Sequence, residues 1–468
     1  MKIISNISWF LGILLMSLSV SCKKYLTLDK PTLGKLDSKT VFKNDATATA
    51  AALACYQNLV FNKFTFNLSN ISGQLSDELT NWSTDENSLY YKNAQNAGAI
   101  SPYDIWNTAY QTIYQANAVY EGINDNPALS AKVRQQLKAE AKFTRAYLHF
   151  CLTNFWGDVP VVTTTDYKIT GMLARSAKDQ IFKQIISDLK DAELNLNVNY
   201  VNATDTVSTN EKIRPNKYAA EALLARVFIY NGDWANAIIE ANKVIDSKVY
   251  KILPELSSVF LKNSDEAIWQ LQPDPKSGIN TPEGNGFILT AIPNYMTPSI
   301  SPNLINSFES NDKRKISWIG SYVDLATNVN YFFPFKYKVQ TGLTISEYTM
   351  VLRLSEQYLI RAEAKAQLGD VSGAAEDLNV IRQRAGLPKT NAITKDDLLA
   401  AILKERQLEL FAEGHRWFDL NRTKSANSVM SIVTPQKGGG TWNSNKALMP
   451  IPQIEISNDP NLSQNPGY

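Results

Sequence analysis

Histidine and cysteine are scarce in this sequence. Its 468 residues include two histidines, His149 and His415, and three cysteines, Cys22, Cys55 and Cys151. No His-x-x-x-His, Cys-x-x-Cys or glycine-rich phosphate loop occurs. A zinc site or a cysteine–histidine nucleophile pair would therefore depend on one of the two histidines. Because Cys55 and Cys151 lie within helical patterns, we expect buried free thiols there, with a disulfide between them as the alternative.

An excess of charge of either sign is also missing. Lys and Arg together number 47, Asp and Glu together number 45, and the sequence contains no long basic run. Nucleic acid is therefore not an expected partner. Aromatic residues, in contrast, are plentiful, with 21 Tyr and 9 Trp. Trp and Tyr serve both in cores and on flat binding surfaces, so their number alone indicates no function.

The N-terminus has the features of an export signal. Lys2 supplies a positive start, and the apolar segment 9–18 is too short to span a membrane. The segment ends in Leu-Ser-Val-Ser-Cys, which resembles the lipobox at which a bacterial lipoprotein is cut and acylated. We predict that residues 1–21 are a cleaved signal peptide, that Cys22 is acylated, and that residues 22–41 form an extended tether. An ordinary secretory signal, with the cysteine inside the mature chain, is the alternative.

The most regular pattern lies in residues 353–420. A helical period over 355–368 ends at Gly369, and a second period starts after Asp370. Alanines at the packing positions let the two helices approach closely, as in tetratricopeptide pairs. Residues 217–246 repeat the alanine spacing and the Gly-Asp step. The sequence therefore predicts a mostly α-helical fold with tetratricopeptide-like helix pairs as its scaffold.

Two long stretches lack any sustained period. Residues 66–103 and 273–348 are rich in polar and aromatic residues, and we interpret both as ordered, loop-rich insertions on one side of the scaffold. A few short strands are expected, among them the alternating segment 267–271. We divide the rest of the chain into an N-terminal helical region, 42–262, and a C-terminal region, 263–468, packed together as one unit.

In the C-terminal region, the helix predicted after Thr394 has Arg406 on its apolar stripe. Glu405, Glu409 and Glu413 follow at i, i+4 and i+8 along the border of that stripe, where carboxylates are partly desolvated and need partners. With His415 they could be metal ligands, but a di-iron pair would need a second Glu-x-x-His helix, which the sequence lacks. We therefore predict no metal site but a structural ion-pair network of Arg406, Glu409, Glu413 and Arg416.

Long ordered motifs in the C-terminal half are similar to those of a known family. They read R-x-S-E-x-Y-L-x-R-A-E-A from Arg353, N-x-I-R-x-R-A-G from Asn379, and E-R-x-x-E-L-x-x-E-G-H-R-W-F-D-L from Glu405. These motifs resemble the SusD/RagB family, surface lipoproteins of Bacteroidetes that work beside a TonB-dependent outer-membrane transporter. The closing segment 448–468 also resembles the family's last motif, except for the interposed Asp459.

The resemblance implies a function. It implies a non-catalytic protein without a cofactor that binds an oligomeric nutrient, most often an oligosaccharide and in one branch a peptide. The partner would be a SusC-like TonB-dependent transporter, and acylated Cys22 would hold the protein on the surface of the outer membrane. A surface glycan hydrolase with its acids in the same loops is one alternative. A tetratricopeptide-type adaptor for a protein segment is another.

The resemblance also directs attention to the aromatic residues of the two insertions. Family members carry ligand-stacking aromatics on an insertion early in the chain and on another past its middle. Trp82 is the first choice, because its neighbours are polar and no helical or alternating pattern places it in a core. We predict a ligand site formed by Trp82, Asn81, Tyr90, Tyr295 and Trp318.

Overall fold

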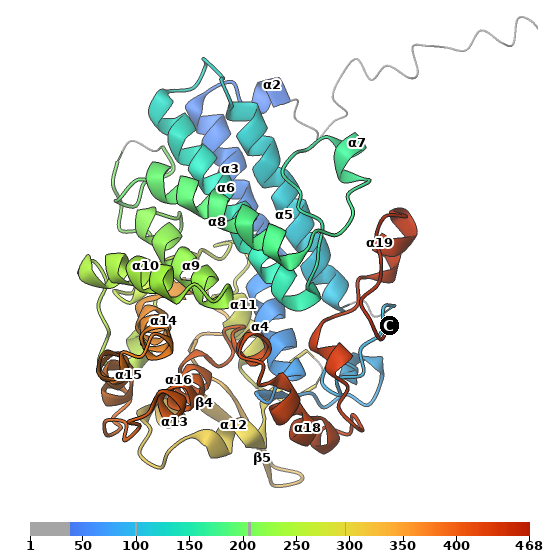
Figure 1. Cartoon of the computed structure of the whole chain (residues 1–468), viewed down its shortest axis with the longest axis vertical. Helices are drawn as coiled ribbons and strands as arrows, with labels where there is room; N and C mark the ends of the chain where they lie inside the picture. The colour runs from blue at the N-terminus through green and yellow to red at the C-terminus, as the bar shows by residue number, and fades with distance from the viewer. Residues whose placement is uncertain (1–37, 99–100, 205–206, 295) are drawn as a thin grey trace, which may run out of the picture.

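The computed structural model describes residues 38–98, 101–204, 207–294 and 296–468 (Figure 1). The predicted signal peptide, Cys22 and most of the predicted tether lie outside these ranges. The last residues of that tether, Ser38–Val41, form the short helix α2 instead of the extended chain that we expected. Within the described ranges, no helix combines the length and the apolar character that crossing a bilayer requires.

Four long helices form the upper half of the molecule in Figure 1: α3 (Asp45–Phe61), α5 (Ser101–Ile123), α6 (Ala131–Trp156) and α8 (Lys178–Asn195). The sequence starts α3 and α6 with caps, since the side chain of Asn44 accepts the Thr47 N–H and that of Ser130 accepts the Val133 N–H. Cys55 and Cys151 are buried free thiols, which confirms the first of the two alternatives for them.

The helix pairs occur where the repeated pattern predicts them. The pairs are α9 (Lys217–Tyr230) with α10 (Trp234–Asp246) and α14 (Leu354–Gln367) with α15 (Val371–Arg384), and α16 (Lys395–Leu410) packs against the second pair. Gly232 and Gly369, with φ of 73° and 88°, reverse the chain, and the next aspartates cap the second helices. Helix α10 packs against α14, so the two pairs are neighbours in space although a long insertion separates them in the sequence. The mostly α-helical, tetratricopeptide-like fold is thus confirmed.

One predicted loop region begins with a helix. Helix α4 (Phe64–Leu75) occupies the first ten positions that we interpreted as loop, 66–75. Side chains on every face of α4 are buried, and Asn70 and Gln74 bond to each other inside the protein at 2.8 Å. Because polar residues and Gly73 stand at buried positions of α4, its sequence shows no apolar run or stripe, and this explains why the pattern did not reveal it.

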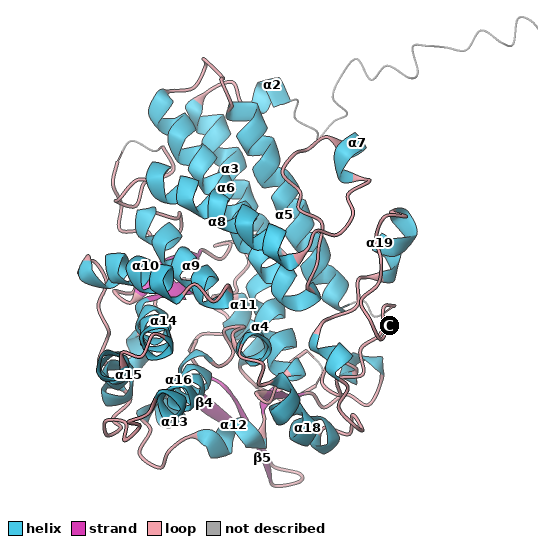
Figure 2. Ribbon diagram, viewed as in Figure 1, coloured by secondary structure: helices cyan, strands magenta, loops and turns pink. Residues whose placement is uncertain are grey.

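The two insertions meet in a small sheet. Strand β1 (Leu79–Thr80) of the first insertion pairs antiparallel with β3 (Ser299–Ile300) of the second. The hairpin strands β4 (Ile319–Asp324) and β5 (Val329–Pro334) lie beside them at the bottom of Figure 2. Strand β2 (Ala267–Leu271), which the alternating pattern predicted, pairs with β6 (Thr349–Arg353).

The remaining helices are mostly short, and apart from α7, which lies between α6 and α8 in the sequence, they belong to the second insertion or to the C-terminal part of the chain. They are α7 (Tyr167–Thr170), α11 (Pro282–Phe287), α12 (Pro302–Ser307), α13 (Lys313–Ser317), α17 (Arg416–Arg422), α18 (Ala426–Gln436) and α19 (Gln453–Asn458). Single 3₁₀ turns occur at Glu86–Ser88, Leu256–Ser258 and Ser444–Ala447. The C-terminal segment passes α19 at the right edge of Figure 1.

A buried ion-pair network fixes helix α16 to its neighbours. The Glu409 carboxylate accepts hydrogen bonds from Arg353 at 2.5 Å, from Arg314 at 3.1 Å and from Arg384. Burial alone would raise the pKa of Glu409, but the Arg384, Arg353 and Arg314 guanidiniums hold it well below its ordinary value. The second glutamate, Glu413, accepts from Arg353 at 2.8 Å. The network therefore connects β6, α13, α15 and α16.

Two partners in this network differ from our expectation. We expected Arg406 and Arg416 to neutralise the glutamates of α16. Instead, Arg406 Nε donates to Asp419 at 2.8 Å, and Arg416 Nε donates to Asp77 of the first insertion at 2.8 Å. Proximity in the sequence was a poor guide, because the partners of Glu409 come from segments that only the fold brings together.

Candidate ligand-binding site

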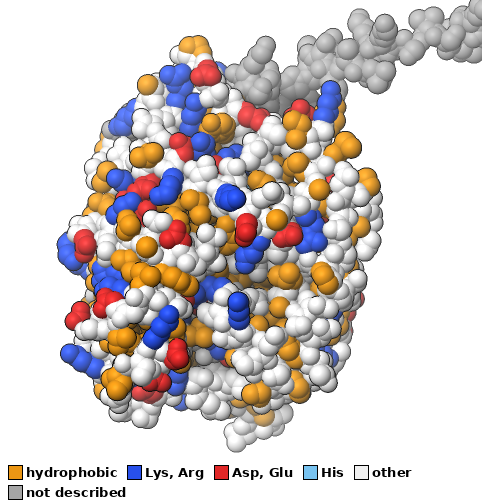
Figure 3. Space-filling view, viewed as in Figure 1, with side chains coloured by type: hydrophobic (Ala, Val, Ile, Leu, Met, Phe, Trp, Pro, Cys, Tyr) orange, Lys and Arg blue, Asp and Glu red, His pale blue; other side chains and the backbone are white. Residues whose placement is uncertain are grey.

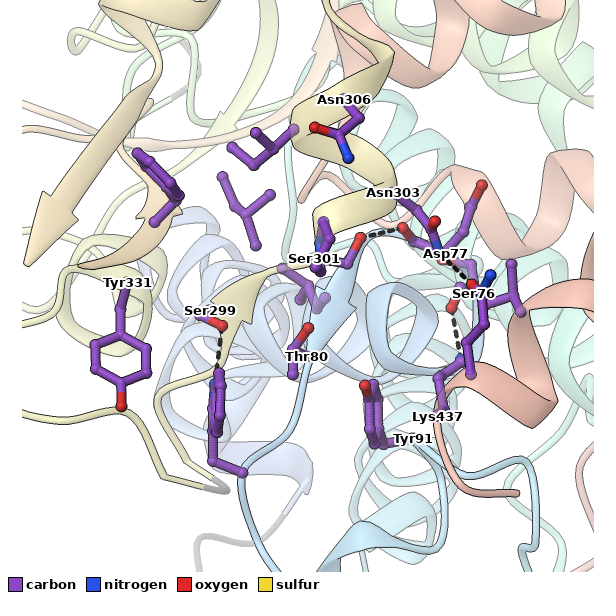
Figure 4. A pocket seen from close by; sticks show the side chains of 18 of the residues that line it. Ser76, Asp77, Thr80, Tyr91, Ser299, Ser301, Asn303, Asn306, Tyr331 and Lys437 are labelled. Atoms are coloured by element: carbon purple, nitrogen blue, oxygen red, sulfur yellow. Dashed lines mark hydrogen bonds between the residues drawn. The ribbon is translucent and has the colours of Figure 1, made fainter. Parts of the chain in front are cut away.

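A cavity of about 580 Å³ opens where the two insertions meet (Figure 4). Its walls come from strands β1 and β3, the hairpin strand β5, and helices α12 and α18. The pairing of Leu79 with Ile300 and of Thr80 with Ser299 thus places segments more than 200 positions apart on one surface. A ligand in this cavity would touch both insertions at once.

Trp82 is the most exposed aromatic residue of the cavity. Its side chain is 47% exposed, and its indole N–H donates to Ser299 Oγ at 2.9 Å. The Tyr331 ring lies edge-on to it, with the centroids 5.1 Å apart and the planes at 86°. The indole is therefore held in a fixed orientation by contacts to both β3 and β5, while much of its surface stays open.

Two tyrosines accompany Trp82. Tyr331 and Tyr91 are half-buried and lie on opposite sides of Ser299 and Thr80 in Figure 4. Desolvation raises the pKa of Tyr91, so its hydroxyl stays protonated and can donate a hydrogen bond at neutral pH. Our sequence analysis selected neither tyrosine. Each lies in an insertion that we had marked, but only the pairing of β1 with β3 shows that they share a cavity with Trp82.

Neutral polar side chains make up most of the remaining polar lining. Asn303 Nδ2 of α12 donates to Gln436 Oε1 of α18 at 3.3 Å across the cavity wall. The hydroxyl and amide groups of the lining belong to Ser76, Thr80, Ser299, Ser301, Asn303, Asn306, Asn330 and Gln436. Such groups can donate and accept hydrogen bonds without carrying charge.

The two charged residues of the lining are already engaged within the protein. Asp77 accepts from Arg416 Nε and Nη2, each at 2.8 Å, and from Gln407 Nε2 at 3.0 Å. Lys437 donates to the carbonyl oxygens of residues 74, 75 and 76 at 2.8, 3.1 and 2.6 Å. Burial would raise the pKa of Asp77, but Arg416 holds it below its ordinary value, and burial lowers the pKa of Lys437 to about 7. The cavity therefore offers a ligand little free charge.

Comparisons with known proteins agree with this fold. Residues 303–468 match the family described as "SusD family", and residues 28–229 match the family described as "Starch-binding associating with outer membrane". The chain belongs to the SusD/RagB family. A SusD-like protein of Formosa agariphila is 22% identical, over 96% of this chain and 97% of its own length.

Solved SusD-like structures share the architecture. A laminarin-binding SusD-like protein superposes with a TM-score of 0.75 and 26% identity, over 91% of this chain and all of that one. Surface glycan-binding protein A from Bacteroides thetaiotaomicron, solved with laminarihexaose, gives a TM-score of 0.75 at 21% identity, over 90% of this chain and 99% of that one.

Within this SusD/RagB fold, Asn81 supports the loop that carries Trp82 and is not itself accessible. Asn81 is buried, its Nδ2 donates to Gln74 Oε1 at 2.8 Å, and its Oδ1 accepts the Ser83 N–H at 2.8 Å. Gln74 continues the chain of amides to Asn70 of α4. Asn81 therefore does not line the cavity, and its amide helps to position the neighbouring tryptophan.

Two other predicted ligand residues lie in the hydrophobic core. Tyr90 is 4% exposed and packs in the main helical core. Trp318 has no exposed surface, and its indole N–H donates to the Leu256 carbonyl at 2.9 Å, with the Lys336 ammonium 4.7 Å from its ring. Neither residue lines the Trp82 cavity, because a polar neighbourhood in the sequence does not exclude burial in space. Tyr295 lies outside the described residues.

The first insertion also contains acids that a hydrolase could use. Glu78 is buried, does not line the cavity, and has one carboxylate oxygen without a hydrogen-bond partner among the described residues. Burial, and then the negative charge of Asp77, raise the pKa of Glu78 to about 8. Among the described residues that line the cavity, Asp77 is the one carboxylate, and Arg416 binds it on both oxygens.

Proposed function

We propose that this protein is a non-catalytic, lipid-anchored binding protein of the outer membrane that captures an oligosaccharide in the cavity beside Trp82. It would deliver the ligand to a SusC-like TonB-dependent transporter. The observation that carries the proposal is the grouping of Trp82, Tyr91 and Tyr331 with neutral amide and hydroxyl groups on one cavity wall. Membership of the SusD/RagB family supports it.

The chemistry of the lining favours an uncharged sugar chain. A sugar ring presents C–H faces that stack on aromatic rings, and hydroxyls that exchange hydrogen bonds with amides and hydroxyls. An acidic glycan would need free cations, whereas Lys437 is engaged by three carbonyl oxygens. The laminarin and laminarihexaose bound by structural neighbours are consistent with this preference.

A hydrolytic role has less support. Glycoside hydrolysis generally uses a pair of carboxyl groups flanking the scissile bond. Asp77 is committed to Arg416, and Glu78 faces the protein interior, where its Oε2 accepts the Ala412 N–H at 3.4 Å. This arrangement supports binding without turnover.

A tetratricopeptide adaptor would need an open face between its helix pairs. Here Arg226 of α9 and Glu356 of α14 form a buried ion pair at 2.6 Å between the two pairs. The space where an adaptor would hold its peptide is thus occupied by the protein's own side chains. Capture of a peptide in the Trp82 cavity remains the competing hypothesis for the ligand.

The proposal is tested by measuring binding and turnover on the same ligands. Laminari-, malto-, cello- and xylo-hexaose, oxidised derivatives of these bearing carboxylates, and hexapeptides would be titrated into the mature chain by calorimetry. We expect a neutral hexasaccharide to bind and to be recovered intact. Release of shorter sugars would indicate a hydrolase, and binding of peptides alone would indicate the peptide branch. Co-purification with a β-barrel transporter from outer membranes tests the delivery role.

A further inference from the structure

A second concave surface lies on helix α5, away from the Trp82 cavity. It encloses about 460 Å³ and shares no lining residue with that cavity. Trp106, Tyr110 and Tyr114 follow one another on α5 at i, i+4 and i+8, so they form an aromatic row along one face of the helix. We call this surface the α5 groove.

The aromatic row is fixed at its inner end and open at its outer end. Trp106 is 2% exposed and packs edge-on against Trp156, with ring centroids 5.2 Å apart. Tyr110 is half-buried and donates its hydroxyl to the Pro160 carbonyl at 2.9 Å. Tyr114 is 55% exposed. A ligand would therefore meet rings that are already oriented, which reduces the entropy lost on binding.

A row of amides runs beside the aromatic row. Asn107, Gln111 and Gln115 also follow at i, i+4 and i+8, and all of them line the groove. Gln111 Nε2 donates to Asn107 Oδ1 at 3.1 Å. The side-chain carbonyl oxygen of Gln115 is buried and has no hydrogen-bond partner among the described residues. That oxygen is out of direct reach of a ligand, so the amides that the row offers to a sugar hydroxyl are those of half-buried Asn107 and exposed Gln111.

Charge is nearly absent from the α5 groove. Its one ionisable acid or base, among the described residues that line it, is Glu455 of α19. Desolvation raises the pKa of Glu455, although a hydrogen bond from the Trp106 indole lowers it in part. A protein partner is favoured by a continuous apolar patch. The α5 groove instead alternates rings with amides, the same combination that lines the Trp82 cavity.

We propose that the α5 groove is a second oligosaccharide-binding site, for the same class of uncharged glycan as the Trp82 cavity. The sugar faces would stack on Tyr110 and Tyr114, and the sugar hydroxyls would bond to the row of amides. This inference rests on the proposed function of the Trp82 cavity. A polysaccharide reaching both sites would bind more tightly than a short oligosaccharide, because the second contact is intramolecular.

The test compares Trp82→Ala, Tyr114→Ala and the double variant in the mature chain, with the hexasaccharides named above as probes. We expect wild type to bind a neutral hexasaccharide at a stronger and a weaker site. Trp82→Ala should leave the weaker site, Tyr114→Ala should leave the stronger, and the double variant should bind nothing measurable. For a polysaccharide of the same linkage, Tyr114→Ala should weaken binding at least several-fold. Tyr167→Ala, which changes a 75% exposed tyrosine outside the groove, is the control.

Other outcomes would overturn the inference in distinguishable ways. If Trp82→Ala alone removes all binding, or Tyr114→Ala changes neither hexasaccharide nor polysaccharide binding, the groove is not a glycan site and the proposed function stands. Loss of transporter co-purification in Tyr114→Ala, with glycan binding intact, would make the groove a protein interface. Failure of wild type to bind any neutral glycan would overturn the proposed function and the inference together. Equal melting temperatures of the variants would exclude unfolding as the cause.

Discussion

The ammonium group of Lys437 lies 2.6 Å from the carbonyl oxygen of Ser76, at the C-terminal end of helix α4. It also donates to the carbonyl oxygens of Gln74 and Leu75. The last carbonyls of a helix have no partner within the helix, and here Lys437 from the end of α18 donates to all three, with Asn93 Nδ2 as a second donor to Leu75 at 2.8 Å. The contact holds α4 against α18 at the edge of the Trp82 cavity.

Replacing Lys437 should therefore destabilise the protein. Lys437→Met keeps a long side chain but takes the lysine donor from the Gln74 and Ser76 carbonyl oxygens, at a cost of roughly 2–3 kcal/mol, whereas the Leu75 carbonyl keeps its hydrogen bond from Asn93. Denaturant unfolding of both proteins measures the difference. Lys404→Met, on the exposed side of α16, is the matched control and should change the unfolding free energy little. Equal losses in the two variants would contradict the capping role.

Trp82 should contribute to ligand affinity more than to stability. Its ring is about half exposed and packs on Tyr331 at one edge only. A stacking contact is worth about 0.5–1.5 kcal/mol beyond the area buried, so Trp82→Ala should weaken binding of a neutral hexasaccharide several-fold or more. Trp82→Phe keeps a stacking face but loses the hydrogen bond to Ser299, so its affinity should be intermediate.

Calorimetry and thermal melting separate the two possible roles of this residue. Weaker binding with an unchanged melting temperature supports a ligand platform. A large fall in melting temperature, or unchanged affinity, would mean that Trp82 is a packing residue and that the sugar binds elsewhere.

The regular elements of this fold could be predicted because their signals are local. Gly369 and Asp370 mark a helix end and a helix start within a few residues, and both are found there. Helix α4 escaped prediction because polar residues such as Ser69, Ser72 and Gln74 occupy its buried positions, where a hydrophobic pattern would show apolar side chains. Helix α9 is also buried on every face, but its buried residues are mostly apolar and it was predicted, so local patterns fail where the buried residues of a helix are polar.

The candidate site could be predicted only in part. Trp82 and the two insertions were found, but Trp318 was assigned to the site and Tyr331 was not. Both lie in the same insertion, and the sequence around each is polar and aromatic. The difference arises from the pairing of β1 with β3 and the packing of β5 beside it, contacts between distant segments that no local pattern encodes.

The lipid anchor is a separate prediction, since Cys22 lies outside the described residues. Stable anchoring requires two or more acyl chains, so loss of the acylated cysteine should remove nearly all membrane affinity. Cys22→Ala should therefore appear in the soluble fraction or remain as an uncleaved precursor. Fractionation with antibody detection measures this, and Cys55→Ala serves as the control thiol. A Cys22→Ala protein that is processed and still as membrane-bound as wild type would contradict the anchor.

Glu409 should be among the most costly acidic residues to remove. Its carboxylate neutralises Arg314, Arg353 and Arg384, and all of these groups are buried. Truncating one partner of a buried ion pair costs about 3–5 kcal/mol, because the remaining charges are left uncompensated. Glu409→Ala should lower the melting temperature strongly, whereas Glu376→Ala, exposed on α15, should not. A small effect at Glu409 would mean that water or other acids replace its carboxylate.

Glu78 should make the folded protein less stable as the pH rises. An acid that is ion-paired in the folded state, such as Glu409, has the opposite effect. Burial raises the pKa of Glu78 to about 8 in the folded protein, against about 4.3 in an unfolded chain. Between these values the folded state holds a proton that the unfolded state releases. Stability from this group is therefore fully present below about pH 4 and is lost as the pH rises toward 8, by up to about 1.4 kcal/mol per pH unit.

Glu78→Gln removes this titration and isolates it from the rest of the protein. The unfolding free energy of the variant minus that of wild type should grow more positive from pH 5 to pH 8 and level off above it. Denaturant unfolding at pH 5, 6.5, 8 and 9 measures the difference, and Glu86→Gln, at an exposed position of the same insertion, is the control substitution. Parallel stability curves for Glu78→Gln and wild type would mean that Glu78 finds a cation or solvent in the folded protein and stays ionised.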